Sequence, residues 1–368
     1  MSKAKKLFIA AIDKNAGKTT TSIALMALAL KKYDRVGYIK PFGGQTVEYR
    51  GRVVDKDVAL MAQVFGLNRD LDFMSPVVLS SDTTHKVVDG LISPQDLQDR
   101  IVHACNQLEK KCDFLLIEGS GHPGVGSVMQ ISNAHIARLL NAPVLMVTGG
   151  GLGNVVDRLA MTQLLFEKEQ VDVKAILVNM LVPEKRDRSL DYLTRALKDE
   201  TFKVIGGFDY QPILANPTLR RISAVLDLPL HGNKRESQRI IHSVQVGAAS
   251  TQRVAELIQE PSIIILTSSR DELIVTLSHL YKMPHYKDLI VGMVISGATA
   301  INSMTQQILD DTNIPYIRAE KMITAELYHT INKDVSKIVA EDREKLDLIK
   351  KLAEKRFDFD VIDELIST

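Results

Sequence analysis

Short apolar runs alternate with segments of helical periodicity over the first two-thirds of the chain. Each run is apolar on both faces, which is what strands buried inside a parallel sheet require. These runs cover residues 7–12, 36–39, 114–117, 143–147, 175–178 and 204–205. The pattern therefore predicts an α/β fold built on a parallel sheet. Ligands of such sheets collect beyond the carboxyl ends of the strands, so the polar residues after each run carry the functional information.

A second, smaller α/β pattern begins near Leu228. Its expected strands are 262–267, 289–296 and 315–317, and its expected helices are 250–259, 271–280 and 301–311. The polar, basic stretch 231–239 is a candidate junction. The charged stretch 341–355 has apolar residues at the spacing of a helix docked on one face. We therefore expect domains at 1–227 and 228–345, followed by a helical tail at 346–368.

Charge and composition exclude several classes of partner. The 368 residues include 46 Lys and Arg against 45 Asp and Glu, so no net field favours nucleic acid or a membrane surface. No apolar run reaches the length of a membrane span, and the N-terminus lacks the pattern of a signal peptide. Cys105 and Cys112 fit reduced core thiols. We expect a cytoplasmic protein that binds neither nucleic acid nor membranes.

The first apolar run ends in a candidate phosphate loop, and an Ala/Leu-rich helical pattern follows it at once. In this context a lysine ammonium reaches the outer phosphates, a threonine hydroxyl suits Mg²⁺, and backbone N–H groups point at the anion. The glycine that usually opens the loop is absent, with Ile12 at the normal spacing and Ala11 one residue earlier. The alternative is an ordinary lysine at a helix start. The predicted nucleotide-binding residues here are Asp13, Lys14, Asn15, Ala16, Gly17, Lys18, Thr19 and Thr20.

Three further charged residues stand at strand ends or helix starts. Lys40 follows the second run and precedes Pro41, Phe42 and two glycines, so it can add positive charge near a γ-phosphate. Asp57 opens a helix, where it either binds Mg²⁺ or only interacts with the helix dipole. Glu118 ends an apolar run, and burying a carboxylate there is costly without a cation or metal. Lys18 and Lys40 are the predicted catalytic residues, and Thr19, Asp57 and Glu118 the predicted metal ligands.

The second pattern offers a weaker candidate site. Arg270 and Asp271 follow one expected strand, and Ser296 and Gly297 end the next. Arg270 could present a bidentate fork to an anionic ligand at that edge of the sheet. The alternative is a solvated helix start.

The order of these motifs resembles the dethiobiotin synthetase-like family of phosphate-loop proteins over residues 5–227. Lys40-Pro41, Asp57 and Glu118-Gly119-Ser120-Gly121 stand where that family has its lysine–proline, metal-binding aspartate and Glu-Gly-x-Gly. The resemblance implies a P-loop NTPase-like domain that holds ATP and Mg²⁺, with Lys40 near the γ-phosphate. It also implies adenine contacts from Asn179 and Tyr210, and a homodimer.

The second domain resembles the small regulatory module called the DRTGG domain, which accompanies a synthetase-like domain at the N-terminus of some phosphotransacetylases. The loop at residues 122–127 differs from the family's substrate loop, so dethiobiotin synthesis itself is not expected. We expect a Mg²⁺-dependent ATP-binding protein that phosphorylates a small-molecule carboxylate or carbamate, or hydrolyses ATP slowly. The alternative is a nucleotide-responsive regulatory or partner-binding protein without ligase activity.

Overall fold

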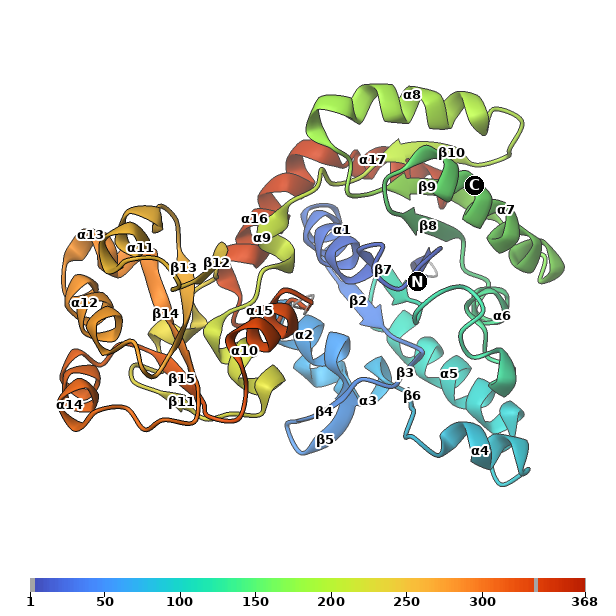
Figure 1. Cartoon of the computed structure of the whole chain (residues 1–368). Helices are drawn as coiled ribbons and strands as arrows, with labels where there is room; N and C mark the ends of the chain where they lie inside the picture. The colour runs from blue at the N-terminus through green and yellow to red at the C-terminus, as the bar shows by residue number, and fades with distance from the viewer. Residues whose placement is uncertain (1–3, 334–336, 368) are drawn as a thin grey trace. The chain divides into compact units, whose positions relative to one another are not determined.

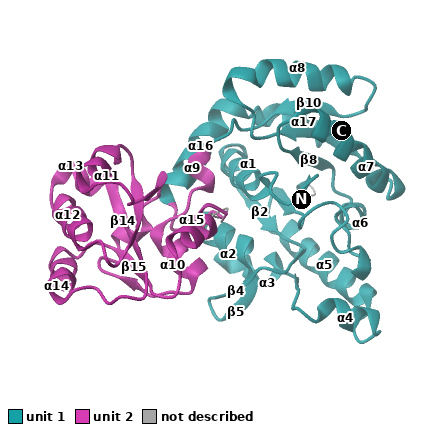
Figure 2. Ribbon diagram, in the orientation of Figure 1, with its two compact units in different colours: residues 1–211, 343–368 teal, residues 212–342 magenta. Residues whose placement is uncertain are grey.

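The computed structural model describes residues 4–333 and 337–367 (Figure 1). They divide into two compact units, shown in different colours in Figure 2. Unit 1 holds the described residues of 1–211 and 343–368, and unit 2 holds those of 212–342.

Unit 1 is built on a parallel sheet with the strand order β10-β9-β8-β1-β7-β2. The burial of these strands explains the continuous apolar runs in the sequence, because helices cover both faces of the sheet. The strands are β1 (Lys5–Ala11), β2 (Val36–Ile39), β7 (Phe114–Glu118), β8 (Val144–Thr148), β9 (Val173–Val178) and β10 (Lys203–Gly206).

Different helices cover the two faces of this sheet. Alternate residues of β1, such as Phe8 and Ala10, share a core with α5, α6 and α7. On the other face α1 contacts β1, β2 and β7, while α16 and α17 contact α1. The helices of unit 1 are α1 (Lys18–Lys32), α2 (Lys56–Val64), α3 (Leu71–Met74), α4 (Thr83–Val88), α5 (Pro94–Glu109), α6 (Asn133–Leu139), α7 (Leu152–Lys168), α8 (Arg186–Ala196), α16 (Arg343–Arg356) and α17 (Phe359–Leu365).

Two small sheets lie between β2 and α5 along the chain. Strand β3 (Phe42–Gly43) pairs with β6 (Val77–Val78), and β4 (Thr46–Tyr49) forms a hairpin with β5 (Arg52–Asp55). The hairpin ends directly at α2, so Asp55 caps that helix by accepting the N–H of Asp57 at 2.9 Å. The chain also has short 3₁₀ turns, η1 (Asn68–Asp70), η2 (Ser127–Met129) and η3 (Pro183–Lys185).

Unit 2 is a second α/β sandwich around a mixed sheet, with the order β11-β15-β14-β13-β12. Only the β11–β15 pairing is antiparallel among the strands described in this sheet. The strands are β11 (Leu230–His231), β12 (Ser243–Val246), β13 (Ser262–Thr267), β14 (Ile290–Ser296) and β15 (Tyr316–Ala319). The helices are α9 (Pro212–Ala215), α10 (Leu219–Leu226), η4 (Glu236–Gln238), α11 (Thr251–Leu257), α12 (Asp271–Tyr281), α13 (Pro284–Leu289), α14 (Ser303–Thr312) and α15 (Thr324–Lys333).

The division of the chain differs from the expected boundaries at 227 and 345. Leu219 and Ile222 of α10 are buried in one core with Ile263 and Ile265 of β13, so this helix belongs to unit 2. The expected junction at 231–239 lies inside unit 2, since His231 pairs with β15. Helical periodicity shows that a segment has an apolar face, but it does not show which sheet that face covers.

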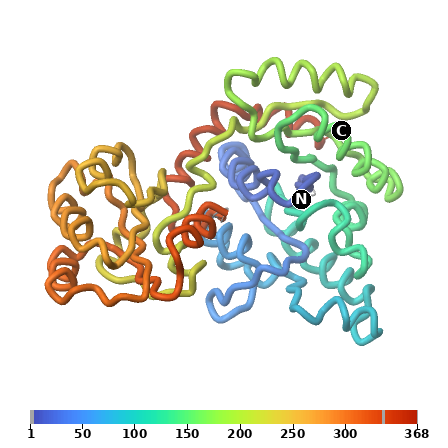
Figure 3. Tube along the Cα trace, viewed as in Figure 1, coloured from blue at the N-terminus to red at the C-terminus, as the bar shows by residue number. Residues whose placement is uncertain are grey.

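The C-terminal segment belongs to unit 1 and is not a separate tail. Figure 3 shows this red segment beside the blue helix α1, in agreement with the contacts between α1 and α16. The Phe359 ring packs edge-on against Phe114 of β7, with ring centroids 5.8 Å apart. The carboxylate of Asp363 accepts hydrogen bonds from Lys5 of β1 and from Tyr33 at the end of α1. These contacts place the last helices within the core of unit 1.

None of the described helices combines the length and apolar character that crossing a membrane demands.

Candidate functional site

The phosphate loop lies between β1 and α1, as predicted. Strand β1 continues through Ala11, which pairs with Val147, so this position has ordinary extended backbone and does not need the missing glycine. Gly17 does need to be glycine, because its φ is +89° and a Cβ there would lie 2.9 Å from the Asn179 amide nitrogen. The loop therefore keeps its turn into α1 despite the altered first position.

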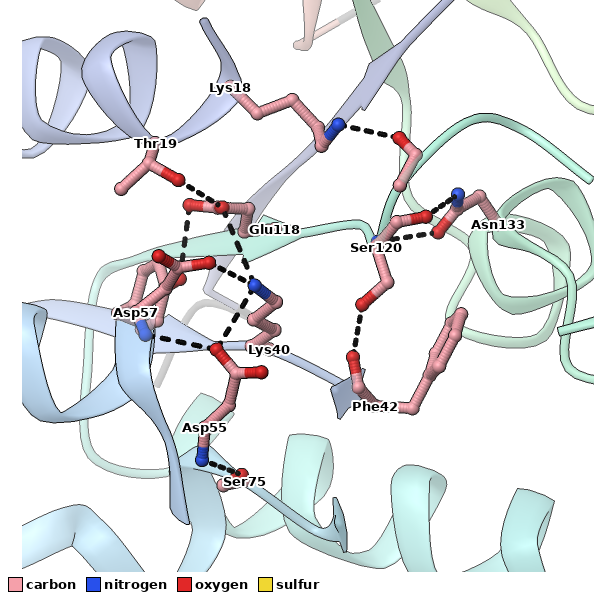
Figure 4. Close-up of polar contacts among 12 residues, drawn as sticks. Lys18, Thr19, Lys40, Phe42, Asp55, Asp57, Ser75, Glu118, Ser120 and Asn133 are labelled. Atoms are coloured by element: carbon pink, nitrogen blue, oxygen red, sulfur yellow. Dashed lines mark hydrogen bonds and ion pairs between the residues drawn. The ribbon is translucent and has the colours of Figure 1, made fainter. Parts of the chain in front are cut away.

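Lys18 extends from this loop toward the segment that follows β7. Its ammonium donates to the carbonyl of Gly121 at 2.5 Å (Figure 4). The buried side chain of Asn133 orders that segment, since it accepts the Ser120 N–H at 2.9 Å and donates to the Ser120 carbonyl at 2.7 Å. Sequence reasoning missed Asn133, which stands on α6 with no strand end to mark it.

Lys40 lies in a cluster of three carboxylates from two sheets and a helix start. Its ammonium contacts Asp57 and lies 3.1 Å from Asp55 and 3.9 Å from Glu118 (Figure 4). All four side chains are at least 90% buried. A Cβ at Gly43 would lie 2.1 Å from the Asp55 carboxylate, so glycine after Lys40 lets that carboxylate approach. Asp55 was not predicted, although its place two residues before Asp57 is a helix-cap signal.

The electrostatics of this cluster favour a cation. Burial lowers the pKa of Lys40, but the carboxylates of Asp57, Glu118 and Asp55 outweigh it, so the pKa is raised. Burial and the neighbouring Asp57 together raise the pKa of Glu118, against the opposing effect of Lys40. One lysine thus shares its positive charge among three carboxylates, which leaves the cluster able to attract a further cation.

Thr19 and Tyr38 fix the orientation of Glu118. The Thr19 hydroxyl donates to one carboxylate oxygen at 3.0 Å, and the Tyr38 hydroxyl donates to the other at 3.0 Å. Burial raises the pKa of Tyr38, so the phenol keeps its proton as a donor. The phosphate loop and the end of β7 are therefore linked directly through Thr19 and Glu118. The role of these two residues as metal ligands stays a prediction.

The donor chemistry around Thr19 fits Mg²⁺. A hydroxyl and carboxylates are the hard oxygen ligands that this ion prefers, and it usually keeps waters and phosphate oxygens as its other ligands. No group of three or more His, Cys, Asp or Glu side chains arranged for a metal occurs in the described part of the chain. Asp57 and Glu118 both face Lys40, so they would bind Mg²⁺ beside this lysine together with Thr19.

A cavity of about 470 Å³ lies beside the phosphate loop, within the size range of small-molecule sites. It opens at the carboxyl ends of β1, β8 and β9. Glycines at 149–151 form one wall without side chains. The residues that line it are Ile12, Asp13, Asn15, Ala16, Gly149, Gly150, Gly151, Asn154, Met180, Leu181, Val182, Lys185 and Ser189.

Asn179 and Tyr210, the predicted adenine contacts, lie near this cavity, but its lining of described residues includes neither. The Asn179 amide donates to the Ala16 carbonyl and to the Thr21 hydroxyl, and accepts the Phe208 N–H at 3.0 Å. Asn179 therefore connects the phosphate loop to the segments that follow β9 and β10. Tyr210 is 54% exposed. The direct adenine contacts stay predictions, and the wall at 180–182 was missed although it follows β9.

Each residue of the candidate site in unit 2 is hydrogen-bonded to another residue of that unit. The Arg270 guanidinium donates to the carbonyls of Gly247 and Ala249 at 2.9 Å, so the expected anion fork is directed at backbone. Asp271 accepts the Thr305 hydroxyl at 2.7 Å. Ser296 donates to the carbonyl of Leu266, and Gly297 accepts from Arg318. A ligand here stays a prediction, and its binding would have to release Arg270 from these carbonyls.

The family model described as an AAA domain, AAA_26, matches residues 5–218. The chain belongs to the AAA_26 family. The match covers the sheet of unit 1, the phosphate loop, Lys40, Asp57 and Glu118, so unit 1 is a P-loop domain of the nucleotide-binding kind.

The distant relatives of this AAA_26 chain include phosphate acetyltransferases and dethiobiotin synthetases. The chain is 22% identical over 361 residues to a phosphate acetyltransferase of Nitratidesulfovibrio vulgaris, which covers 96% of this chain and 50% of that protein. Only 41% of a second phosphate acetyltransferase, from Synechocystis, is covered. The chain thus spans about half the length of these relatives. An ATP-dependent dethiobiotin synthetase of Thermodesulfovibrio yellowstonii is 27% identical over 192 residues, 49% of this chain and 78% of that enzyme.

A solved structure of the CBS and DRTGG domains of a Clostridium perfringens pyrophosphatase, complexed with diadenosine tetraphosphate, is 15% identical. It covers 45% of this chain and 77% of that one, with a TM-score of 0.26. A likeness at this level assigns no family to unit 2.

Proposed function

We propose that unit 1 binds ATP with Mg²⁺ and transfers the γ-phosphoryl group. The observation that carries this proposal is the convergence of Thr19, Glu118, Asp57 and Lys40 beside the phosphate loop. A phosphate loop that only binds phosphate does not need the buried charged side chains next to it. Burying three carboxylates and an ammonium is costly, and a site where charge moves during a reaction would use them.

Each residue has a role that follows from its position. The N–H groups of the loop and the start of α1 bind phosphate oxygens, and Lys18 leaves the Gly121 carbonyl to bind the outer phosphates. Thr19, Asp57 and Glu118 would hold Mg²⁺, which neutralises phosphate charge when bound. Lys40 adds a positive charge where negative charge develops. The cavity beside the loop holds the nucleoside.

The proposed acceptor is a small carboxylate or carbamate. Its oxygen would take the phosphoryl group and form an acyl phosphate, with ADP as the other product. The similarity to dethiobiotin synthetases supports this class, as does the resemblance of Lys40-Pro41 and Glu118-Gly119-Ser120-Gly121 to the motifs of that family. The sequence of the loop at 122–127 differs from that of the substrate loop in the dethiobiotin synthetase-like family, and this difference favours a substrate other than the one those enzymes use.

A second candidate is a nucleotide-responsive regulatory protein without ligase activity. The alignment with the phosphate acetyltransferase of Nitratidesulfovibrio vulgaris supports it, because it runs over 96% of the chain and so includes unit 2. In this case ATP binding to unit 1 would change how unit 2 meets a partner, and phosphoryl transfer would be absent.

Calorimetric titration with ATP, with and without Mg²⁺, tests the binding step. Release of ADP and phosphate, measured with and without a panel of small carboxylates, tests transfer. We expect Mg²⁺-dependent ATP binding and turnover that a carboxylate accelerates. An absence of ATP binding would contradict both candidates. Tight binding with no turnover under any condition would favour the regulatory candidate.

A further inference from the structure

Asp209 holds three segments of unit 1 together. It lies beyond β10, and its carboxylate is 94% buried. One carboxylate oxygen accepts from Arg186 at the start of α8 at 2.7 Å. The other accepts from Arg356, the last residue of α16. A buried carboxylate needs such partners, so the ion pairs fix the position of the chain around residue 209.

The segment that Asp209 anchors supports a wall of the cavity. Residue 209 forms a parallel bridge with Leu181, and the Tyr210 N–H donates to the Leu181 carbonyl at 2.8 Å. Leu181 also donates its own N–H to the carbonyl of Phe208 at 3.2 Å. Leu181 lines the cavity beside the phosphate loop. Displacing residues 208–210 would therefore displace this wall.

The C-terminal segment strengthens the same support from outside. The rings of Phe208 and Phe357 pack with their centroids 4.7 Å apart. Arg186 donates to the Gly207 carbonyl at 2.9 Å. The residue before Arg186 in the chain, Lys185, lines the cavity. Two elements, α8 and the end of α16, thus hold the 207–210 segment against the cavity wall.

We infer that Asp209 and Arg356 are positioning residues for the nucleoside end of the nucleotide site. The inference rests on the proposed ATP binding, and it adds that residues near the C-terminus help to shape the pocket. The phosphate end depends on the loop, Lys18 and Thr19. The side chain of Asn179 links it to the 207–210 segment, since this amide accepts the Phe208 N–H and donates to the Ala16 carbonyl of the loop. Loss of the Arg356 ion pair should therefore weaken recognition of the nucleoside, because the 207–210 segment contacts Leu181 of the cavity wall directly. Recognition of the phosphates should weaken less, because the segment reaches the loop only indirectly, through Asn179.

The test compares ATP with inorganic tripolyphosphate, both with Mg²⁺, on the full chain. Arg356→Gln should weaken ATP binding about 10-fold and weaken tripolyphosphate binding clearly less. Arg356→Lys keeps the charge without the planar fork, so it should fall between wild type and Arg356→Gln. Glu354→Gln is the matched control, because it removes an exposed 2.6 Å ion pair between the same helix and Lys31. It should bind both ligands like wild type.

The outcomes separate this inference from the proposed function. If wild type does not bind ATP, the proposed function fails. If wild type binds ATP and a folded Arg356→Gln variant binds it equally well, Arg356 has no positioning role. An equal loss of both ligands would also overturn the inference, because it would place the effect at the phosphates. Should Arg356→Gln fail to fold, the same comparison with Arg356→Lys and with Asp209→Asn decides.

Discussion

Lys40 is the residue on which the buried charges of unit 1 depend. It contacts or faces Asp55, Asp57 and Glu118, and all four side chains are buried. Removing the ammonium leaves carboxylates without their cation, so Lys40→Met should lower the free energy of unfolding by about 3 kcal/mol. Urea denaturation without divalent ions measures this. Added Mg²⁺ should recover part of the loss, because a cation that binds the folded state stabilises it. An unchanged midpoint would contradict the role of Lys40.

Lys18 should affect nucleotide binding more than stability. Its ammonium donates to one backbone carbonyl at 2.5 Å, and a phosphate would offer a charged acceptor instead. Lys18→Ala should weaken ATP binding by about 2 kcal/mol, or roughly 30-fold, in calorimetric titration. Lys31→Ala, on the exposed end of the same helix, is the control and should bind ATP normally. Equal affinities for wild type and Lys18→Ala would remove the phosphate-loop assignment.

Glu118 should matter for Mg²⁺ more than for the fold. A glutamine at this position keeps one acceptor oxygen for one of the two hydroxyls of Thr19 and Tyr38, both at 3.0 Å, and its amide NH2 can donate to the other hydroxyl oxygen, but it lacks the charge that binds the ion. Glu118→Gln should therefore fold normally and lose about 10-fold in the Mg²⁺-dependent part of ATP affinity. Titrations of ATP at several Mg²⁺ concentrations measure this. A variant with the wild-type Mg²⁺ dependence would show that Glu118 is only structural.

At the scale of elements, one carboxylate of α17 makes several polar contacts with the rest of unit 1. Asp363 lies 3.0 Å from Lys5 and 2.9 Å from Lys32, and it also accepts from Tyr33. Burial raises its pKa, but the hydrogen bonds from Tyr33, Lys32 and Lys5 outweigh this, so the pKa lies below its usual 3.8. Asp363→Asn should lower the free energy of unfolding by about 2 kcal/mol at neutral pH.

The pH dependence of that difference has a definite sign. A depressed carboxyl pKa in the folded state gives stability above the unfolded pKa, and this stability is lost as pH falls through the folded value. The difference in unfolding free energy between wild type and Asp363→Asn should therefore be full at pH 7, narrower at about pH 3.8, and lost as the pH falls further through the lowered pKa of the folded state. Denaturation at both pH values checks this, with Glu354→Gln as a surface control that costs less than about 0.5 kcal/mol.

The elements that sequence predicts best are the buried ones. Strands β1, β7 and β8 lie where continuous apolar runs stand, because both of their faces are covered. The β4–β5 hairpin was missed since its residues are largely exposed, as at Val53, and follow no buried pattern. The residues of the candidate site also differ in how well the sequence predicts them. Strand ends marked Lys40 and Glu118, whereas Asn133 depends on tertiary contacts that no local pattern encodes. Asp55 at a helix cap and the wall at 180–182 after β9 do stand at local signals, but only the tertiary fold connects those signals to the site.

At the scale of the whole molecule, unit 1 is interrupted in sequence and unit 2 is continuous. Residues 212–342 carry their own sheet and cores, so they should fold alone and unfold cooperatively. Residues 1–211 alone lack a set of buried apolar side chains, each worth about 1.5–3 kcal/mol. These side chains are Leu346, Ile349, Phe357, Phe359 and Ile362.

A two-piece experiment tests this division. The fragment 1–211 should be unstable alone and gain a cooperative thermal transition when a peptide of residues 343–368 is added. A peptide with Phe359→Ser is the control, because it loses the ring contacts with Tyr33 and Phe114. A fragment 1–211 that is already fully stable without the peptide would show that the C-terminal helices are dispensable.

The placement of α16 and α17 also sets an order of events during synthesis. Domains generally fold as units while the ribosome is still translating, the N-terminal one first. Here unit 1 cannot complete its fold until residues 343–368 have been synthesised, because they are part of it. Unit 2 can therefore complete its fold before unit 1 does. The face of the sheet that α17 covers stays open in the nascent chain until residues 343–368 have been synthesised. We expect this interval to be the period in which the chain most needs a chaperone.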